Sequence, residues 1–441
     1  MLNIKEKYLK ISHNEFWNKL VKNVTTVIIG NGGSSVINLI ITVIMTRVLG
    51  NTTYGLFLIA LQYMNLLDGI INFQSWVGVI KYGSEAIVEE REDKLAAIFK
   101  SGFIIDIVTA VAGTIVAVII LPLVVHFMKW ESNLPTLALL FSIEILFHIE
   151  GTSVGILRLY DKFSYTAKQS IVAAVLKLLF VGGYLLLGGK SIVIVTILYV
   201  FTDILKYLLL VVMAISVLQK EIGILNVVKS SVKILDKNFL KYTIWNNISY
   251  TVDVPVKYFD IFIISFISVD MVAVYKVFKQ ITQVFSMLVN PISQVILPQF
   301  SELVAKNRIE EALSKVIKLR NAILAVGSVA VVLSIIFGKT VFTWILGVEY
   351  GNNIFLFEII FITYILLMSY IAIHPLFDAL GVAEMSFVYT ALSNVIYICM
   401  AIGCVKWLGI YSIILATLIQ GGYIIYMKYR YTKKKILNEK V

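Results

Sequence analysis

Long apolar stretches recur along the chain and are separated by short polar segments. About 20 residues of helix cross the roughly 30 Å hydrocarbon core of a bilayer, and the apolar runs have about this length. They show little of the alternation with period two that is typical of an outer-membrane barrel strand. We therefore predict about twelve transmembrane helices, at about residues 24–46, 54–80, 98–125, 134–158, 165–188, 191–218, 240–266, 271–297, 319–345, 352–378, 385–405 and 408–428.

The most polar segment between two predicted spans lies near the middle of the chain, at residues 219–239. It leaves six predicted spans on either side. The first apolar run is too long for a signal peptide, and no small-residue cleavage site follows it before Arg47, so we expect the segment before it to be retained. The predicted organisation is a cytoplasmic amphipathic segment (1–23), an N-lobe (24–218), an inter-lobe loop (219–239), a C-lobe (240–428) and a basic cytoplasmic tail (429–441).

The two halves share a weak internal similarity. Sliding the first half by 221 residues places Tyr54 and Phe57 on Tyr275 and Phe278. An even number of spans in each half makes such a repeat parallel, with its pseudo-axis along the membrane normal. The predicted fold is an all-α integral membrane protein with two parallel six-helix lobes around a central cavity.

Composition agrees with a membrane protein and changes the interpretation of the charge. Apolar residues make up 59% of the chain and charged residues 15%, against about 25% charged in an average soluble domain. The net charge of +11 would suggest nucleic acid if it were concentrated on one face. Here the basic residues are spread over loops between spans, so we expect contact with anionic lipid headgroups and none with nucleic acid.

The basic residues also predict the orientation of the chain. Lys and Arg in short loops are retained on the cytoplasmic side. With both termini in the cytoplasm, most of the basic residues fall inside. The predicted outer loops then carry only Arg47, Lys129, Lys190, Lys339 and Lys406.

Charged residues inside the predicted spans are the main candidates for function, because each costs about 2.5–3.5 kcal/mol on insertion scales. Lys257 lies four residues after Asp253 and three before Asp260, so the three share one helical face. Asp203 and Lys206 are spaced in the same way. In both groups, opposite charges on the same helix can neutralise each other. A purely structural ion pair therefore stays open as the alternative to a binding role.

Lys177, Lys276 and Lys279 have no acidic residue three or four positions away on their own helix. They need a partner on another helix, water or an anion. These lysines therefore indicate a cationic cavity suited to an anionic headgroup such as a diphosphate, with lysine acting as a point charge. The alternative is that their ammonium groups reach the membrane surface while the stems stay in the membrane.

Four acidic residues are candidates for ion coupling: Asp68, Glu144, Glu150 and Asp253. Glu144 and Glu150 flank His148 on the fourth span. Removal from water favours the protonated form of a carboxyl group, which a proton-coupling residue requires. A hydrogen-bonded structural carboxyl is the competing interpretation.

Motifs for enzymatic chemistry are missing from the sequence. The nearest approach to the phosphate-binding loop G-x-x-x-x-G-K-[ST] runs from Gly183 to Ser191 and is wrong by one residue. There is no H-E-x-x-H sequence and no nucleophile elbow. We therefore expect a transporter without a cofactor, driven by an ion gradient, the membrane potential or the gradient of its substrate.

One local pattern resembles a known family. The end of the first span and the next loop contain Thr46-Arg47-Val48-Leu49-Gly50, followed by Tyr54-Gly55. This is similar to the Thr-Arg-x-Leu-Gly and Tyr-Gly pattern of the polysaccharide-repeat-unit (Wzx-type) flippases, which belong to the multidrug, oligosaccharidyl-lipid and polysaccharide exporter superfamily. The chain departs from that family at Asn72-Phe73-Gln74, where many relatives have Asp-Phe-Gly, and at Ala273-Val274-Tyr275, where Gly-x-Tyr is usual.

The resemblance implies an alternating-access exporter of the bacterial cytoplasmic (inner) membrane. It would move an undecaprenyl-diphosphate-linked oligosaccharide from the inner to the outer leaflet for a surface polysaccharide such as O-antigen, capsule or exopolysaccharide. Other polysaccharide assembly proteins would be partners. The expected headgroup contacts in its cationic cavity are Arg47, Lys177, Lys257, Lys276 and Lys279.

Three alternatives differ from this interpretation in what they require. A cation-coupled multidrug antiporter of the same superfamily predicts an acidic cavity. A membrane glycosyltransferase or polymerase usually has a large external loop, whereas no predicted outer loop here exceeds about ten residues. A scaffold of a polysaccharide assembly complex would keep assembly without transport. Lipid II flippases of the superfamily typically have fourteen spans, so twelve disfavour that assignment.

Overall fold

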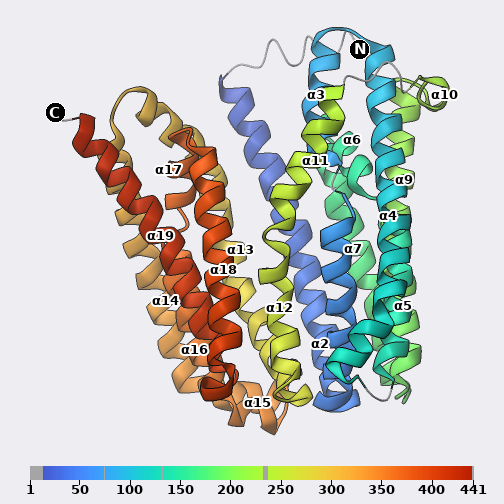
Figure 1. Cartoon of the computed structure of the whole chain (residues 1–441), viewed down its shortest axis with the longest axis vertical. Helices are drawn as coiled ribbons and strands as arrows, with labels where there is room; N and C mark the ends of the chain where they lie inside the picture. Colours follow the sequence, from blue (N-terminus) through green and yellow to red (C-terminus); the bar gives the residue numbers. More distant parts are fainter. Residues whose placement is uncertain (1–12, 74, 131–132, 232–236, 440–441) are drawn as a thin grey trace. The chain divides into compact units, whose positions relative to one another are not determined.

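The computed structural model describes residues 13–73, 75–130, 133–231 and 237–439, and in these ranges the chain is helical apart from its connecting turns (Figure 1). The first half contains α2 (His13–Ile71), α3 (Trp76–Val88), α4 (Glu92–Met128), α5 (Leu134–Phe147), α6 (Gly151–Leu159), α7 (Phe163–Lys177), the π-helical turn η1 (Leu178–Gly182), α8 (Gly183–Leu186), α9 (Ile192–Glu221), α10 (Ile224–Lys229) and α11 (Lys237–Thr251). The second half contains α12 (Val254–Ser265), α13 (Val269–Ala305), α14 (Ile309–Ile345), α15 (Val348–Asn352), α16 (Ile354–Ser369), α17 (Ile373–Ala379), α18 (Ala383–Leu408) and α19 (Tyr411–Glu439).

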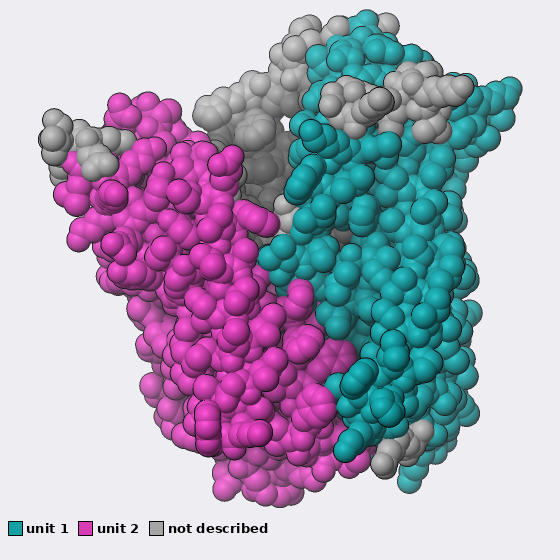
Figure 2. Space-filling view, viewed as in Figure 1, with its two compact units in different colours: residues 1–49, 56–254 teal, residues 50–55, 255–441 magenta. Residues whose placement is uncertain are grey.

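These helices form two compact units, coloured separately in Figure 2. Unit 1 comprises residues 1–49 and 56–254, and unit 2 comprises residues 50–55 and 255–441. Helix α11, which the sequence analysis assigns to the C-lobe, belongs to unit 1. The predicted lobe boundaries themselves stay a prediction.

Eight helical stretches in the described residues are long and apolar enough to cross a membrane. They cover the predicted spans one to six and nine to eleven. The remaining predicted spans correspond to α11 with α12, to α13 and to α19.

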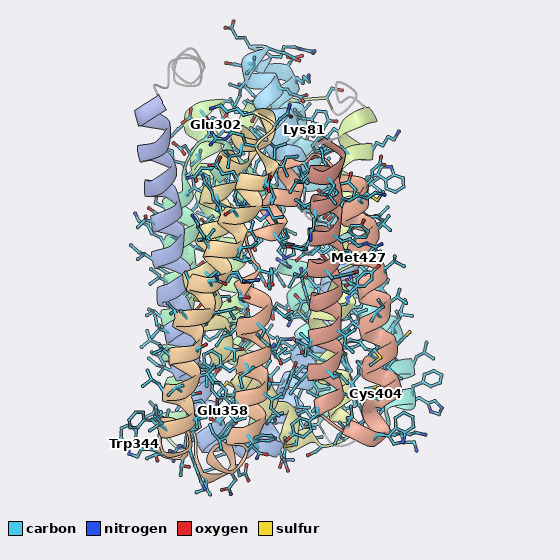
Figure 3. The ribbon with its side chains drawn as sticks, turned by 90° about the vertical axis from the view of Figure 1, so that its left-hand side faces the viewer. Lys81, Glu302, Trp344, Glu358, Cys404 and Met427 are labelled. Atoms are coloured by element: carbon cyan, nitrogen blue, oxygen red, sulfur yellow. The ribbon has the colours of Figure 1, made fainter. Side chains whose placement is uncertain are left out.

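The side chains on the outside of unit 2 match a lipid environment. Helix α14 exposes Val326, Val329, Leu333 and Ile336 to more than half of their full extent. At the end of α14, Trp344 is 80% exposed, and Figure 3 shows it at the opposite end of the unit from Glu302. An apolar belt with an exposed tryptophan at its edge is typical of a membrane-facing surface.

Helix α2 is two helices joined at Gly50, which has φ 76° and ψ 166°. This left-handed conformation favours glycine and explains its place in the Thr-Arg-x-Leu-Gly pattern. The residues that follow belong to unit 2. There the Asn51 amide donates to Glu349 and accepts from the Tyr350 hydroxyl at 3.0 Å, and Thr52 Oγ1 donates to Asp270 Oδ1 at 2.5 Å.

Both units contain a broken fourth span. In unit 1, α5 ends at Phe147 and α6 begins at Gly151; in unit 2, α16 ends at Ser369 and α17 begins at Ile373. Both ends of the second break lie 222 residues after those of the first. Interrupted helices at corresponding positions of two repeats point to the binding sites of transporters.

The two aromatic residues matched by the internal similarity also play corresponding roles. Phe57 in unit 1 packs edge to face on Phe141 of α5, with 5.2 Å between ring centroids. Phe278 in unit 2 packs on Phe357 of α16 at 5.4 Å. Each joins the second and fourth spans of its own unit, which supports a duplication.

We predict that Gly55→Ala destabilises the protein while Gly422→Ala does not. A Cβ atom at Gly55 would lie 2.3 Å from the Val269 carbonyl oxygen, whereas nothing lies within 4 Å of one at Gly422. Overpacking at such a contact costs about 1–3 kcal/mol, and alanine in a helix is about 1 kcal/mol better than glycine. Thermal unfolding of the purified protein in detergent measures both variants, and an unchanged midpoint for Gly55→Ala would contradict the close approach.

Candidate functional site

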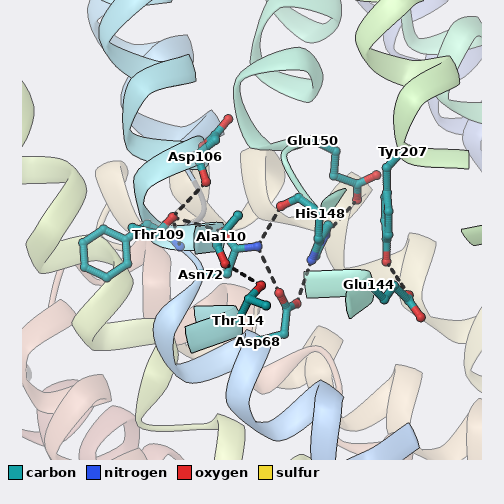
Figure 4. A network of polar contacts seen from close by, with 11 residues as sticks. Asp68, Asn72, Asp106, Thr109, Ala110, Thr114, Glu144, His148, Glu150 and Tyr207 are labelled. Carbon is teal, nitrogen blue, oxygen red and sulfur yellow. Dashed lines mark hydrogen bonds and ion pairs between the residues drawn. The ribbon is translucent and has the colours of Figure 1, made fainter. Parts of the chain in front are cut away.

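The break in span four leaves backbone groups without helical partners, and side chains from other parts of unit 1 form hydrogen bonds with these groups. The His148 carbonyl oxygen accepts a hydrogen bond from Asn72 Nδ2 at 2.7 Å (Figure 4). At the start of α6, the backbone N–H of Thr152 donates to Asp106 Oδ2 at 2.7 Å. Inside a membrane each such group must be satisfied by protein. Asn72 and Asp106 therefore stabilise the broken conformation.

Asp68, His148 and Glu150 form an acid–base trio beside this break (Figure 4). His148 Nδ1 lies 2.7 Å from Asp68 Oδ2, and His148 Nε2 lies 3.6 Å from Glu150 Oε1. Asp68 Oδ1 accepts a second hydrogen bond, from Asn72 Nδ2, at 2.9 Å. The trio can hold or release a proton within the membrane, because the imidazole has a carboxylate at each nitrogen.

A further acid, Glu144, is linked to the trio through Tyr207. The Tyr207 ring stacks on His148 with 4.5 Å between centroids. Its hydroxyl donates to Glu144 Oε1 at 3.0 Å. Glu144 is buried, and its Oε2 atom has no hydrogen-bond partner among the described residues. A buried carboxyl oxygen without a donor favours a protonated or ligand-bound state.

Two cavities flank this network inside unit 1. The larger, of about 320 Å³, lies among α2, α5, α7 and α9, and we name it the lysine cavity because Lys177 and Lys206 are on its wall. The smaller, of about 170 Å³, is lined by Asp68, Asn72, Trp76, His148, Glu150 and Arg158. The Arg158 guanidinium lies 4.5 Å from the centre of the Trp76 ring.

The lysine of α7 is neutralised across the lysine cavity. Lys177 Nζ lies 2.8 Å from both carboxylate oxygens of Asp203, and 3.4 Å from the centre of the Tyr199 ring. The expectation that Lys177 needs a partner from another helix is therefore met by Asp203 of α9. The spacing along α9 also allows Asp203 to pair with Lys206, but this carboxylate instead contacts Lys177 of α7.

The predicted cations of unit 2 are divided in a similar way. Lys279 is paired with Asp260, an acid on α12 that is only 1% exposed. Lys276, three residues earlier on α13, makes no hydrogen bond or ion pair with another described residue. The spacing along the seventh span allows Asp260 to pair with Lys257. In the structure Asp260 instead pairs with Lys279 of α13.

The remaining predicted site residues lie outside these clusters. Arg47 is exposed near the end of the first half of α2, and Lys257 is exposed on α12. Asp253 is half-buried in the turn between α11 and α12. The headgroup and ion-coupling roles predicted for these residues stay predictions.

Sequence analysis missed Asp106 and the break itself. Asp106 is the only acid in the apolar part of α4 and is 1% exposed. A single acid in an apolar span is itself a signal of a functional or structural role, which the sequence contained. Asn72, a departure from the Asp-Phe-Gly pattern, has a clear role here. Its amide donates to His148 and Asp68, and an ionised aspartate has no donor.

The described residues contain no group of three or more His, Cys, Asp and Glu side chains suited to a metal ion.

Comparison with solved structures defines the class of fold. A structure described as the inward-facing conformation of a multidrug resistance MATE family transporter of the MOP superfamily has a TM-score of 0.73 and 15% identity, and covers 92% of this chain and 95% of that chain. A structure described as lipid II flippase MurJ, inward closed conformation, has a TM-score of 0.67 and 17% identity, and covers 92% and 87%. The chain thus has the multidrug exporter and flippase fold, and the predicted all-α membrane fold is confirmed.

Sequence comparison then gives the family. A family model described as Polysaccharide biosynthesis protein matches residues 20–304, and the chain belongs to this family. Inner membrane protein YghQ of Escherichia coli (strain K12) is 27% identical over 116 residues, which are 26% of this chain and 33% of that protein. The resemblance found in the first span is confirmed by the match to this family.

We predict that Lys177 and Asp203 behave as a structural pair in a double-mutant cycle. Lys177→Met or Asp203→Leu alone leaves one buried charge without its partner, which costs about 3–5 kcal/mol. The double variant removes both charges and should recover most of the lost stability. Thermal unfolding in detergent measures the cycle. Additive losses in the double variant would show that the two side chains do not depend on each other.

Proposed function

We propose that this protein is a flippase for lipid-linked oligosaccharides that contributes to surface polysaccharide biosynthesis. The observation that carries the proposal is the polar network at the break of span four, which lies within residues 20–304 matched by the polysaccharide biosynthesis family. A membrane-embedded set of ionisable groups is expensive to insert and is retained for transport in most membrane proteins that have one. The exporter fold supports the same conclusion.

The cargo is an undecaprenyl-diphosphate-linked glycan, moved from the inner to the outer leaflet of the bacterial cytoplasmic membrane. The inner-membrane relative of Escherichia coli supports this localisation. Both termini are cytoplasmic in this proposal, as the distribution of Lys and Arg predicts. Anionic lipids contact the basic loops, and other polysaccharide assembly proteins supply and consume the cargo.

Energy enters through the acid–base trio and Glu144. Asp68 accepts from both His148 and Asn72, and Asn72 also bonds to the broken backbone. Protonation of Asp68 removes its negative charge from His148 and weakens the contacts that hold the break. A change in protonation therefore shifts the balance between two conformations of span four, which is the differential interaction that coupling requires.

The cationic groups bind the diphosphate. Lys276 supports this role because it makes no hydrogen bond or ion pair with another described residue. Arg47 and Lys257 are exposed candidates for the same headgroup. Lys279 is paired with Asp260 and would bind the headgroup by exchanging this carboxylate for the diphosphate. Asp253, near Lys257 in sequence, remains a candidate for coupling.

A cation-coupled multidrug antiporter is the second candidate, favoured by one observation. The smaller cavity has Asp68 and Glu150 on its wall, and acidic groups suit a cationic drug. Drug resistance conferred on a sensitive host, without rescue of surface glycan, would replace the flippase proposal.

We predict that Asp68→Asn abolishes export while leaving the protein in the membrane. The amide keeps the size of the side chain and removes the proton-binding site, so surface glycan should fall at least tenfold. The measurement is surface-polysaccharide complementation in a flippase-null bacterium, with lipid-linked repeat units quantified in parallel at matched expression.

Glu302→Gln is the matched control, because it changes an exposed acid that pairs with Lys306 at the surface. It should export like the wild type. Normal export by Asp68→Asn would remove the trio from the coupling mechanism, and failure of the wild type to rescue any tested host would count against the flippase proposal.

A further inference from the structure

The lysine cavity contains a cation that the proposed network does not use. Four charged side chains lie on its wall: Glu144, Lys177, Asp203 and Lys206. The Lys177 and Asp203 charges cancel in their ion pair. Lys206 and Glu144 remain, and neither of them is in an ion pair within the described residues.

The ammonium group of Lys206 has an aromatic ring as its direct contact among the described residues. It lies 4.6 Å from the centre of the Tyr207 ring, and it makes no hydrogen bond to another described residue. Glu150, Asp203 and Glu144 act on it electrostatically from a distance. A lysine ammonium has three N–H donors, and Lys206 lies on the wall of the cavity, so these donors are available to a ligand there.

The second unit contains the counterpart of this lysine, and there it has a protein partner. Lys428 and Tyr429 lie 222 residues after Lys206 and Tyr207, the same separation as the two helix breaks. Lys428 is buried and its Nζ lies 3.2 Å from His374 Nδ1. The repeat thus places a lysine beside the broken span in both units, and only the lysine of unit 1 lacks a side-chain acceptor.

We propose that the lysine cavity of unit 1 binds a phosphate oxyanion, with Lys206 as the binding residue. The proposal deepens the proposed function, because it assigns a headgroup contact for a polyprenyl diphosphate to a residue outside the predicted set. A cavity of about 320 Å³ is at the small end of ligand pockets. It accommodates phosphate groups, while the glycan and the lipid chain lie outside it.

Other groups on the wall support an anion. Asn38 and Asn65 line the same cavity and carry amide donors. One N–H of Asn65 is engaged by Gln62 Oε1 at 3.0 Å, which leaves its second N–H for a ligand. Glu144 opposes an anion when it is ionised, and it becomes a donor through Oε2 when it is protonated. Its Oε1 is already engaged by Tyr207. Binding of the anion therefore favours the neutral form of Glu144.

The test is isothermal titration calorimetry of the purified full chain in phosphatidylcholine nanodiscs at low salt. Inorganic pyrophosphate and farnesyl diphosphate are the two probes. Lys206→Gln should weaken binding of the accepted probe by about tenfold to hundredfold, since one charge-assisted contact is lost. Glu144→Gln removes the opposing charge and should strengthen binding several-fold. Lys206→Arg should retain most of the affinity.

Lys220→Gln is the matched control, because Lys220 is exposed on the last turn of the same helix. It should bind like the wild type. Binding of farnesyl diphosphate alone identifies a lipid headgroup as the source, and binding of pyrophosphate alone identifies a free phosphate; both support the site. Equal affinities of the wild type and Lys206→Gln, or no binding of either probe, would overturn it.

Complementation separates this proposal from the proposed function. If the wild type rescues surface glycan and Lys206→Gln exports normally, the flippase proposal holds and Lys206 has no role in transport. Lysine-dependent diphosphate binding without rescue in any host would retain the site and remove the flippase.

Discussion

The hydrogen bonds that satisfy the break in span four are the interaction on which the rest of unit 1 depends. A helix interrupted within a membrane leaves N–H and C=O groups that lipid cannot satisfy, at a cost of several kcal/mol for each group. Asn72 and Asp106 supply the missing partners for His148 and Thr152. Because Asn72 directly follows α2 and Asp106 is on α4, the break connects three spans at one point. The ionisable groups are positioned by this junction rather than by the regular helices around it.

The same junction connects charge to conformation. Asn72 uses one amide group to contact both the broken backbone and the carboxylate of Asp68. A change in the charge of Asp68 therefore acts directly on a hydrogen bond that stabilises the break. The same change also acts through His148, which contacts Glu150 with its other ring nitrogen and stacks on the Tyr207 ring. A short chain of contacts thus reaches from the trio to the wall of the lysine cavity.

Local sequence was sufficient to predict features that depend on one helix. Apolar length predicted the spans, and the Thr-Arg-x-Leu-Gly pattern predicted the family; the φ of 76° at Gly50 explains the glycine of this pattern. The lack of acidic neighbours predicted that Lys177 and Lys279 need a partner on another helix, water or an anion. Asp203 and Asp260, on other helices, are their partners. Which acid meets which lysine depends on helix rotation and packing, so spacing along α9 does not determine the partner of Asp203.

The duplication explains why one lysine is available and its counterpart is not. Both units place a Lys-Tyr pair on the last span beside a broken fourth span, so the repeated arrangement includes the cation. In unit 2 the second residue of the helix after the break is His374, whose imidazole accepts a hydrogen bond from Lys428. In unit 1 the corresponding position is Thr152, whose backbone is engaged by Asp106 and whose hydroxyl contacts Ser75 at 2.9 Å. Without a side-chain acceptor from the broken span, Lys206 keeps its donors available to a ligand in the cavity. The acceptor that His374 provides in unit 2 thus has no counterpart in unit 1, where Lys206 is suited to bind an anion.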